Sequence, residues 1–381
     1  MAKTYSVAEM AHLAGVPRET LLEWEAAGKL GDVPRDDAGR RVMGFENAVK
    51  AIDLGRRTTR RRISVVNQKG GVGKTTTVFT LAAAFAELGR RVLAVDLDAQ
   101  ANLTSSFGYD PDTLELTSED LITEEGVSAE DVILETAIEG VHLVPADIKL
   151  CSVDVKIHEM FMREYILLNK LRHLFGHYHV VLFDCPPNLS KITINALLAS
   201  EEVVVPVETQ SYSIKAISDL TNTFSLLKSK MSHMLRVWVL PTKVDRRVRL
   251  ANDFLQALDQ HFGACLMDPI SIDANVIKAP MIFEPVTRSF PASRAAREYL
   301  RLARFLSLPD AERDAFEPSP DRFAVLDDDV DDPFAPPEEQ DASLYDETEE
   351  EAPEAPKPER REPPAAKPSA APSPRPDAAK K

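Results

Sequence analysis

Residues 67–76, NQKGGVGKTT, place three glycines, two lysines and two threonines within ten positions. Glycines let backbone N–H groups turn toward an anion, a lysine supplies a cation for phosphate oxygens, and a threonine hydroxyl can ligate Mg²⁺. The stretch differs from the usual phosphate-binding loop, G-x-x-x-x-G-K-[ST], because Gln68 stands where the first glycine should be and Lys69 follows it. It therefore predicts a phosphate site with an extra positive charge, five residues before Lys74.

The loop predicts contacts to the phosphates of a nucleoside triphosphate. Lys74 is expected to reach the β and γ phosphates, and the Thr75 hydroxyl is expected to bind Mg²⁺. The amino terminus of the helix that follows adds the positive end of its dipole. The residues that we assign to the bound nucleotide are Lys69, Gly70, Gly71, Val72, Gly73, Lys74, Thr75 and Thr76.

Three aspartates stand at the ends of two apolar runs further along the chain. Asp96 and Asp98 end VLAVDLD, on the same side because strand residues alternate, and Asp184 ends VVLFD. The carboxyl ends of parallel strands face the ligand crevice of a sheet. Asp184 is typical of the Walker B acid that holds Mg²⁺, so Thr75 and Asp184 form the expected metal site. Asp96 is expected to support the loop or the surroundings of the metal.

The elements that must position these residues alternate between strands and helices. Such alternation predicts an α/β fold with a doubly wound, mostly parallel sheet, as in P-loop nucleoside triphosphatases. We expect strands within residues 63–68, 90–104, 179–187, 201–209 and 235–245, and helices at residues 74–89, 214–228 and 249–263.

Six motifs give the chain a resemblance to a known family. In order they read KGGVGKTT, VLAVDLDAQANLT, DCPP, VVVPVETQSYSIKAI, LPTKVDRR and AREYLRLA. Together they resemble the ParA family of partitioning ATPases, within the deviant Walker A group that includes MinD, over about residues 62–307. The resemblance implies ATP and Mg²⁺ as cofactors, an ATP-bound homodimer, and slow hydrolysis that a partner accelerates.

The resemblance also gives roles to three site residues. Lys69 matches the signature lysine that crosses the dimer interface to the phosphates bound by the partner, and Asp98 matches the residue that positions the attacking water. Electrostatics supports this role for Lys69, because two triphosphates brought face to face repel each other unless each face contributes a cation. We therefore expect Lys69, Lys74 and Asp98 to be catalytic.

The segment TKVD, Thr242 to Asp245, is close to the N-K-x-D sequence that binds guanine in GTPases. Asp245 could accept hydrogen bonds from the ring and exocyclic N–H groups of guanine, which makes GTP the alternative nucleotide. Because threonine replaces the asparagine and the family resemblance favours ATP, ATP is the expected nucleotide, and Thr242 and Asp245 are counted among the residues expected to bind it.

Residues 1–55 predict a small helical domain. Ser6 and Glu9 form a capping box, and Gly15 ends the first helix before Pro17 begins the next. A second helix, a polar turn and a third helix follow. The stretch resembles the MerR-type winged helix-turn-helix over about 50 residues.

Glu19, Leu22 and Glu23 stand where that family usually carries basic residues, which weakens the case for reading a base sequence. DNA binding by this domain is the first interpretation, and a protein contact or a structural role is the alternative. Residues 56–62, RRTTRRR, are expected to form a basic linker that follows a nucleic-acid backbone, or else a solvated linker. The arginines available for phosphates in the domain are Arg18, Arg35, Arg40 and Arg41.

Basic residues also gather in the carboxyl-terminal part of the ATPase. The ParA resemblance implies that the ATP-bound dimer binds DNA there without sequence preference, and that a ParB-like or other adaptor protein links it to a cargo. A solvated surface is the alternative for each of these side chains. The expected DNA contacts are Arg246, Arg247, Arg249, Lys278 and Arg294, with Arg288 and Arg297 nearby.

The last segment, residues 308–381, differs in composition from the rest of the chain. It contains 22 acidic and 9 basic residues, so it carries −13 of the formal net charge of −16. Its abundance of Pro, Ala, Glu and Asp predicts a disordered tail, either a solubilising extension or an interaction segment. The remaining domains are then 1–55, 56–62 and the ATPase at 63–307.

Three other functional classes each require features of their own. A membrane-bound MinD-like protein needs a carboxyl-terminal amphipathic helix, and the chain ends in proline and charge instead, so we expect no membrane partner. An iron–sulfur ATPase needs paired cluster cysteines, whereas Cys151, Cys185 and Cys265 are far apart. A transcriptional autoregulator that uses the helix-turn-helix, with the ATPase as modulator, is the alternative function. Without a signal peptide or a long apolar run, we expect a cytoplasmic, nucleoid-associated protein.

Overall fold

The computed structural model describes residues 3–36, 38–55, 59–209 and 213–315. Within those residues the chain forms a seven-stranded sheet with the order β3-β4-β2-β5-β1-β6-β7. Every pairing is parallel except that of β3 with β4. The strands are β1 (Arg61–Val65), β2 (Val92–Asp96), β3 (Leu134–Glu135), β4 (Val141–Val144), β5 (Val180–Asp184), β6 (Glu202–Glu208) and β7 (Arg236–Thr242).

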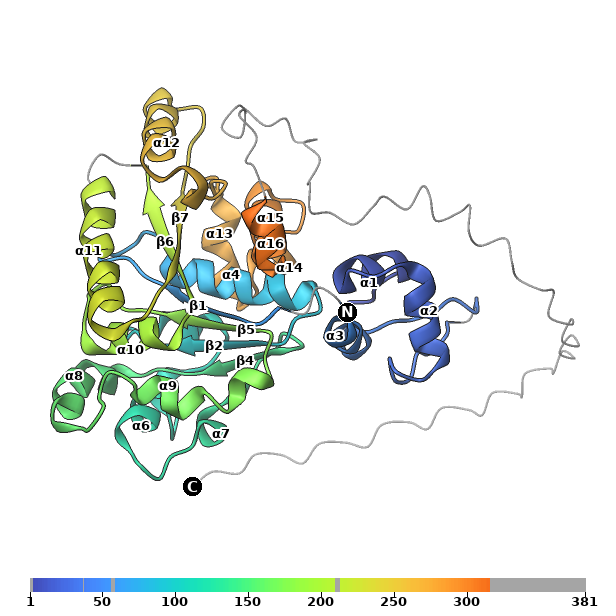
Figure 1. Ribbon diagram of the computed structural model, residues 1–381, viewed down its shortest axis with the longest axis horizontal. Helices are drawn as coiled ribbons and strands as arrows, with labels where there is room; N and C mark the ends of the chain where they lie inside the picture. Colours follow the sequence, from blue (N-terminus) through green and yellow to red (C-terminus); the bar gives the residue numbers. More distant parts are fainter. Residues whose placement is uncertain (1–2, 37, 56–58, 210–212, 316–381) are drawn as a thin grey trace, which may run out of the picture. The chain divides into compact units, whose positions relative to one another are not determined.

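Helices cover both faces of this sheet (Figure 1). On one face α4 (Lys74–Glu87) packs against α15 (Arg294–Ser307), and on the other face lie α9 (Ile166–Leu171) and α10 (Lys191–Ala199). Alternate residues of the central strands β2 and β5 enter one or the other of two buried apolar clusters. The predicted doubly wound, mostly parallel sheet is therefore confirmed.

The other helices of the described residues are short or lie at the periphery. The bounds are α5 (Asn102–Ser106), α6 (Ser118–Thr123), α7 (Ala129–Val132), α8 (Val153–Lys156), α11 (Ser213–Met231), α12 (Arg249–Phe262), α13 (Ala274–Lys278), α14 (Val286–Ser289) and α16 (Asp310–Asp314).

The strand order creates a crevice at the carboxyl end of β1. From β1 the chain continues to β2 and β5 on one side, and later to β6 and β7 on the other side. Ligands bind in open parallel sheets where the direction of winding reverses in this way. The register brings Val65, Asp184 and Asp96 level with one another at that edge.

The predicted boundary between linker and ATPase is wrong. Strand β1 begins at Arg61, because that side chain is buried and pairs with Glu202 at 3.5 Å and with Asp310 at 3.0 Å. Arg62 pairs with Glu201. These arginines pair with acidic side chains of the ATPase, which leaves them less available for the predicted contact with a nucleic-acid backbone. Arg60 also pairs within the protein, and Arg56 and Arg57 lie outside the described residues.

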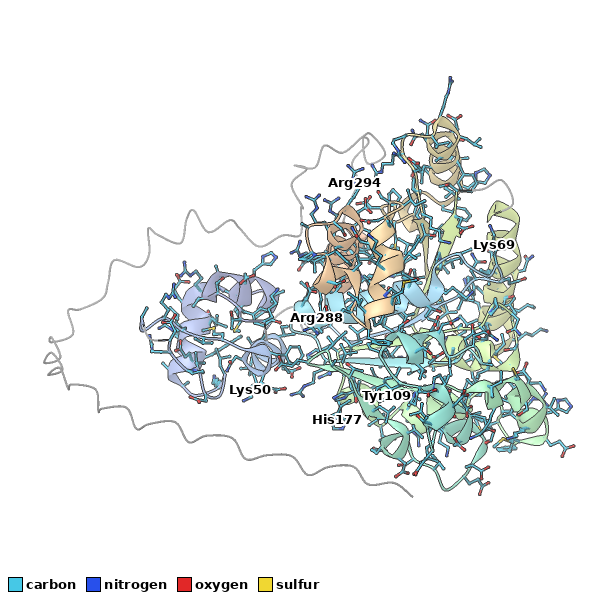
Figure 2. All side chains as sticks on the ribbon, turned by 180° about the vertical axis from the view of Figure 1, so that it is seen from behind. Lys50, Lys69, Tyr109, His177, Arg288 and Arg294 are labelled. Carbon is cyan, nitrogen blue, oxygen red and sulfur yellow. The ribbon has the colours of Figure 1, made fainter. Side chains whose placement is uncertain are left out.

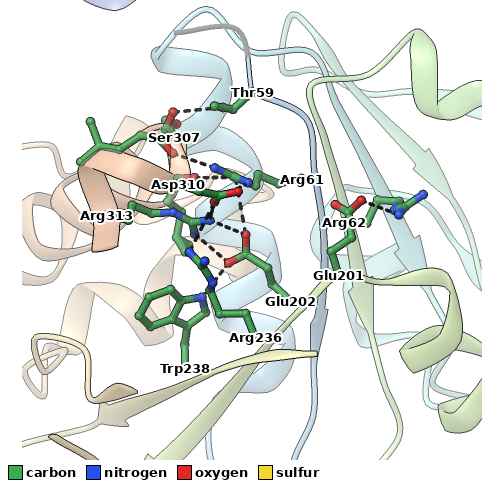
Figure 3. A network of polar contacts seen from close by, with 12 residues as sticks. Thr59, Arg61, Arg62, Glu201, Glu202, Arg236, Trp238, Ser307, Asp310 and Arg313 are labelled. Carbon is green, nitrogen blue, oxygen red and sulfur yellow. Dashed lines mark hydrogen bonds and ion pairs between the residues drawn. The ribbon is translucent and has the colours of Figure 1, made fainter. Parts of the chain in front are cut away.

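The first residues of the predicted tail belong to the fold. Helix α16 places Arg313, which is only 4% exposed, against Glu202 with two bonds of 2.8 and 2.9 Å (Figure 3). The indole N–H of Trp238 donates to the same carboxylate at 2.6 Å. The ATPase therefore extends to residue 315, and the expectation of disorder for the remaining tail falls on residues 316–381, which lie outside the described part of the chain.

The N-terminal domain, residues 3–55, consists of α1 (Val7–Ala14), α2 (Arg18–Ala26) and α3 (Phe45–Leu54). The capping box is confirmed: the Glu9 N–H donates to Ser6 Oγ at 3.1 Å, and the Ser6 N–H donates to Glu9 Oε2 at 2.8 Å. Gly15 ends α1 with a φ of 67°, as predicted. The Arg35 to Arg41 segment closes a small antiparallel bridge.

Helix α3 also buries residues against the ATPase. Phe45 and Val49 join the buried cluster of α4, and the Tyr5 hydroxyl donates to the Ala86 carbonyl at 3.2 Å. Gly140 has a φ of 81°, and a Cβ there would lie 2.0 Å from the Phe45 ring. The close approach of Phe45 therefore depends on glycine at residue 140.

Candidate active site

The glycine loop between β1 and α4 has the shape that a phosphate site needs. Gly71 and Gly73 have φ angles of 76° and 95°, which other residues rarely adopt, and Gly73 caps the amino terminus of α4. No atom of the described residues lies within 4 Å of where a Cβ would stand on Gly70, Gly71 or Gly73. The loop therefore leaves space beside its backbone for phosphate oxygens.

The loop belongs to a cavity of about 610 Å³, a size that suits a nucleotide. One end of the cavity is lined by residues of the P-loop together with Asp98 and Asn102. The lining also includes a second segment, mostly apolar, that the sequence patterns did not indicate. This segment contributes Ile270, Ser271, Ile272, Asp273, Val276, Ile277 and Pro280.

Asp184 meets the requirements of a metal ligand. Both of its carboxylate oxygens are buried and have no hydrogen-bond partner within the described residues. Burial and the nearby Asp96 raise its pKa well above the usual range, although the Thr75 hydroxyl and Lys74 act to lower it. A buried carboxylate without a hydrogen-bond partner is costly, so Asp184, together with the Thr75 hydroxyl, fits a bound cation such as Mg²⁺.

Asp96 has a structural role instead. Its carboxylate accepts bonds from the Thr104 N–H at 2.9 Å, the Thr104 hydroxyl at 2.7 Å and the Asp98 N–H at 3.1 Å. Burial raises its pKa to about 6. These bonds fix the loop that carries Asp98, which remains half-buried at the cavity wall.

The two lysines of the loop point to different places. Lys74 is only 7% exposed, and its ammonium donates to the Lys69 carbonyl at 3.3 Å. Burial lowers the pKa of Lys74, and the carboxylates of Asp184 and Asp98 act to raise it. The Lys69 side chain is 39% exposed (Figure 2) and reaches Glu208 at the end of β6.

Glu208, the last residue of β6, holds Lys69 in this position. Its Oε2 lies 2.9 Å from Lys69 Nζ, and its Oε1 lies 2.8 Å from Lys243 Nζ. The Lys243 ammonium also donates to the Gly71 carbonyl. Partial burial acts to raise the pKa of Glu208, but the two lysines outweigh it and keep that pKa below the usual range. Sequence analysis missed Glu208 and Lys243; the only signal was a charged residue at a strand's carboxyl end.

The two residues predicted to bind the base have different outcomes. Thr242 lines the cavity, and its hydroxyl donates to the Val72 carbonyl at 2.8 Å. Asp245 is absent from the described lining and instead binds Arg247 through bonds of 2.8 and 2.7 Å. This pairing lowers the pKa of Asp245 to about 2. Asp245 thus lies outside the described cavity lining, and its assignment to the base stays a prediction.

The residues predicted to contact DNA differ in how exposed they are and in whether they pair with acidic side chains. Arg249 and Lys278 are exposed, Arg294 begins α15, and Arg246 is partly buried in a group with Glu298. In the N-terminal domain Arg40 pairs with Asp36 at 2.8 Å and Arg41 pairs with Glu25 at 2.7 Å, whereas Arg18 begins α2. Paired arginines are less available for phosphates, and Arg247 is occupied by Asp245.

No helix in the described part of the chain has both the length and the apolar character to cross a bilayer. Nor do the described residues bring three or more His, Cys, Asp or Glu side chains together as metal ligands. Cys185 is buried, whereas Cys151 and Cys265 are exposed.

Comparison with known proteins connects this geometry to a family. Residues 60–237 match the family described as an AAA domain. The chain is 34% identical over 244 residues to the sporulation initiation inhibitor protein Soj of Bacillus subtilis, covering 64% of this chain and 96% of Soj. It is 31% identical over 259 residues to the chromosome partitioning protein ParA of Caulobacter vibrioides, covering 67% of this chain and 97% of that protein. The chain belongs to the ParA/Soj family.

A solved structure of similar fold shows the expected ligands. Cobyrinic acid a,c-diamide synthase of Mycobacterium smegmatis, with a bound ATP analogue and magnesium, is 32% identical with a TM-score of 0.57. The match covers 65% of this chain and 94% of that one. The ParA/Soj chain is accordingly an ATPase that uses ATP and Mg²⁺, as the loop and the buried aspartates predict.

Proposed function

We propose that the protein is an ATP-driven switch that pairs with a second copy only when both carry nucleotide. One observation supports this most directly: of the two loop lysines, Lys74 is buried at its own site, while the Lys69 side chain is 39% exposed and pairs with Glu208 at 2.9 Å. A cation placed there can leave Glu208 and reach the phosphates of an opposed copy. Such a contact offsets the repulsion between two facing triphosphates.

Within each copy the residues divide the work of hydrolysis. Lys74 and the glycine amides hold the phosphates, Thr75 and Asp184 would hold Mg²⁺, and Asp98 orients the water that attacks the γ phosphorus. The metal neutralises charge on the phosphates when it is bound. Because Asp96 fixes the backbone N–H of Asp98, the water-orienting group is held in place before the substrate binds.

The proposed output is DNA binding without sequence preference, followed by positioning of a cargo through a ParB-like or other adaptor. Arg249, Lys278 and Arg294 form the proposed contact. Replacing these three by glutamate is expected to abolish ATP-dependent binding to random-sequence DNA while ATP affinity stays unchanged. An unchanged DNA affinity would remove this part of the proposal. Such copies would reside in the cytoplasm on the nucleoid, and hydrolysis would release them.

Pairing itself is tested by Lys69→Ala, compared with Lys149→Ala. Lys149 is a matched control, since it is also an exposed lysine in an ion pair, with Asp147 at 3.2 Å, and it lies outside the cavity lining. Light scattering with ATP should show dimers for the control and monomers for Lys69→Ala, with both variants still binding ATP. Dimers in both variants would contradict the proposal.

A second candidate function is transcriptional autoregulation through the N-terminal domain. The three helices and the small antiparallel bridge between Arg35 and Arg41 favour it, while the pairing of Arg40 and Arg41 with acidic side chains opposes it. A footprint on a defined operator that persists at salt concentrations where binding to random-sequence DNA is lost would favour this candidate. Uniform loss of both kinds of binding would exclude it.

A further inference from the structure

Helix α15 carries arginines along one face. They recur at intervals of three, four and three residues, a spacing that places side chains on the same side of a helix. The opposite side packs on α4 through Ala295, Ala296, Tyr299, Leu302, Ala303 and Leu306. We call the following four residues the arginine stripe: Arg294, Arg297, Arg301 and Arg304.

The stripe runs the whole length of the helix. With 14 residues, α15 is about 21 Å long. Its first residue, Arg294, is visible in Figure 2, and the Asp273 carboxylate in the cavity wall accepts the N–H of the neighbouring Ala295 at 3.4 Å. Its last residue, Ser307, accepts a bond from the Thr59 hydroxyl at 3.0 Å, at the base of the sheet. The stripe thus connects the cavity end of the ATPase with the opposite end.

The chain leaves the described structure beside the far end of this helix. Helix α16 follows α15 after two residues and is fixed by the buried Arg313–Glu202 pair (Figure 3). A second bond, from Arg61 to the Leu308 carbonyl at 2.7 Å, holds the connection itself. Whatever follows residue 315 therefore starts from a fixed point next to the stripe.

The sequence that follows is complementary in charge and in length. Residues 327–332, DDDVDD, place five aspartates within six positions. Six extended residues span about 20 Å, close to the length of α15. The twelve residues after Ala315, up to Asp327, have an expected end-to-end distance of about 20 Å, which is enough to turn back along the helix.

We propose that the acidic segment, residues 321–334, docks along the arginine stripe and covers it. Each pair on such a surface is weak, but several act together, and the short connection keeps the segment at an effective concentration near the millimolar range. DNA phosphates offer the stripe the same chemistry, so the acidic segment competes with DNA for it. That competition rests on the proposed function, whereas the docking does not.

Docking is measured within the full-length chain by energy transfer between two dyes. Cys151 and Cys265 are replaced by serine, Cys185 being buried, and the dyes are attached through Ala292→Cys, exposed just before α15, and Ala335→Cys, just after the acidic segment. We expect high transfer at 50 mM salt and low transfer at 1 M, because salt screens surface pairs.

Two sets of substitutions decide whether the named groups are responsible. Replacing the five aspartates of residues 327–332 by asparagine should lower the transfer, and so should Arg297→Glu together with Arg301→Glu. The matched control replaces the acidic run Glu349, Glu350 and Glu351 by glutamine, and should leave the transfer unchanged. Equal transfer in all variants, or an equal fall in the control, would overturn the proposal.

DNA binding by the same variants separates this proposal from the proposed function. The asparagine variant should bind random-sequence DNA with ATP about tenfold more tightly than the natural chain, because the competing segment is removed. If the transfer behaves as expected and DNA affinity does not change, docking stands and the DNA role of the stripe fails. If transfer never depends on the aspartates, docking fails even where DNA binding is present.

Discussion

The ion pair between Lys69 and Glu208 gives a quantitative prediction about self-association. Glu208→Gln keeps the shape of the side chain and an oxygen for Lys243, but it removes the charge that holds Lys69. The pair spans 2.9 Å, with the lysine 39% and the glutamate 15% exposed. Partly exposed pairs of this kind contribute about 0.5–1 kcal/mol.

Two such pairs must break when two copies join. Removing both therefore favours the dimer by about 1–2 kcal/mol, which corresponds to a roughly 5- to 30-fold lower dissociation constant. Sedimentation equilibrium with ATP measures this constant directly, in a background of Asp98→Ala so that hydrolysis does not reverse the association.

Lys243→Ala provides the comparison for this experiment. It removes the other cation on Glu208, so the carboxylate should hold Lys69 more strongly and weaken the dimer. If Glu208→Gln weakened the dimer as much as Lys243→Ala does, the carboxylate would not compete for Lys69. The interpretation of Glu208 as a restraint on Lys69 would then be refuted.

Other predictions concern stability. Arg313→Ala leaves Glu202 buried without its main partner and should lower the free energy of unfolding by about 3–5 kcal/mol in urea titrations. Arg236→Ala removes a more exposed ion pair and should lower it by less than about 1 kcal/mol. Equal losses in the two variants would contradict the claim that burial sets the size of the effect. Burial raises the pKa of Asp96 to about 6 and that of Asp184 well above the usual range, so the folded state binds more protons than the unfolded state. The stability contributed by Asp96 should be complete below pH 3.8 and should be lost as the pH rises through about 6. Asp184→Asn should stabilise the nucleotide-free protein at pH 7 and flatten this pH dependence, which thermal unfolding measures. It should also lower ATP turnover, which phosphate release measures. A variant less stable than the natural chain at pH 7 would contradict this prediction.

The parts of the fold that sequence predicts are those set by local patterns. The glycine loop, the apolar strand before it and the capping box of α1 depend on residues within a few positions of one another, and the structure contains each of them. The mostly parallel pairing of the strands followed from the alternation of strands and helices, but their order in the sheet did not. Six ordered motifs were enough to indicate the family.

The errors and omissions concern contacts between distant parts of the chain. Glu208 lies 139 residues from Lys69, and Arg313 lies 111 residues from Glu202, so no local pattern marks either pair. The acidic composition of residues 308–381 did not indicate the short helix α16. A single buried arginine, Arg313, fixes that helix against the sheet. The TKVD motif likewise did not show that Asp245 pairs with Arg247.

The placement of charges in the N-terminal domain also depends on the fold. Glu25 was not considered in the sequence analysis, yet it contacts Arg41 and lies within 4.0 Å of Arg35 once α2 and the bridge are formed. Whether the domain resembles the MerR type in function stays a prediction. Its packing through Phe45 against Gly140 is a property of the structure that composition does not show.

The central claim is that Lys69 makes self-association depend on nucleotide. Analytical ultracentrifugation of the natural chain and of Lys69→Ala, each with and without ATP and Mg²⁺, tests it most directly. We predict that only the natural chain with ATP sediments as a dimer, while the variant binds ATP and remains monomeric. A Lys69→Ala protein that dimerises with ATP as the natural chain does would contradict the claim.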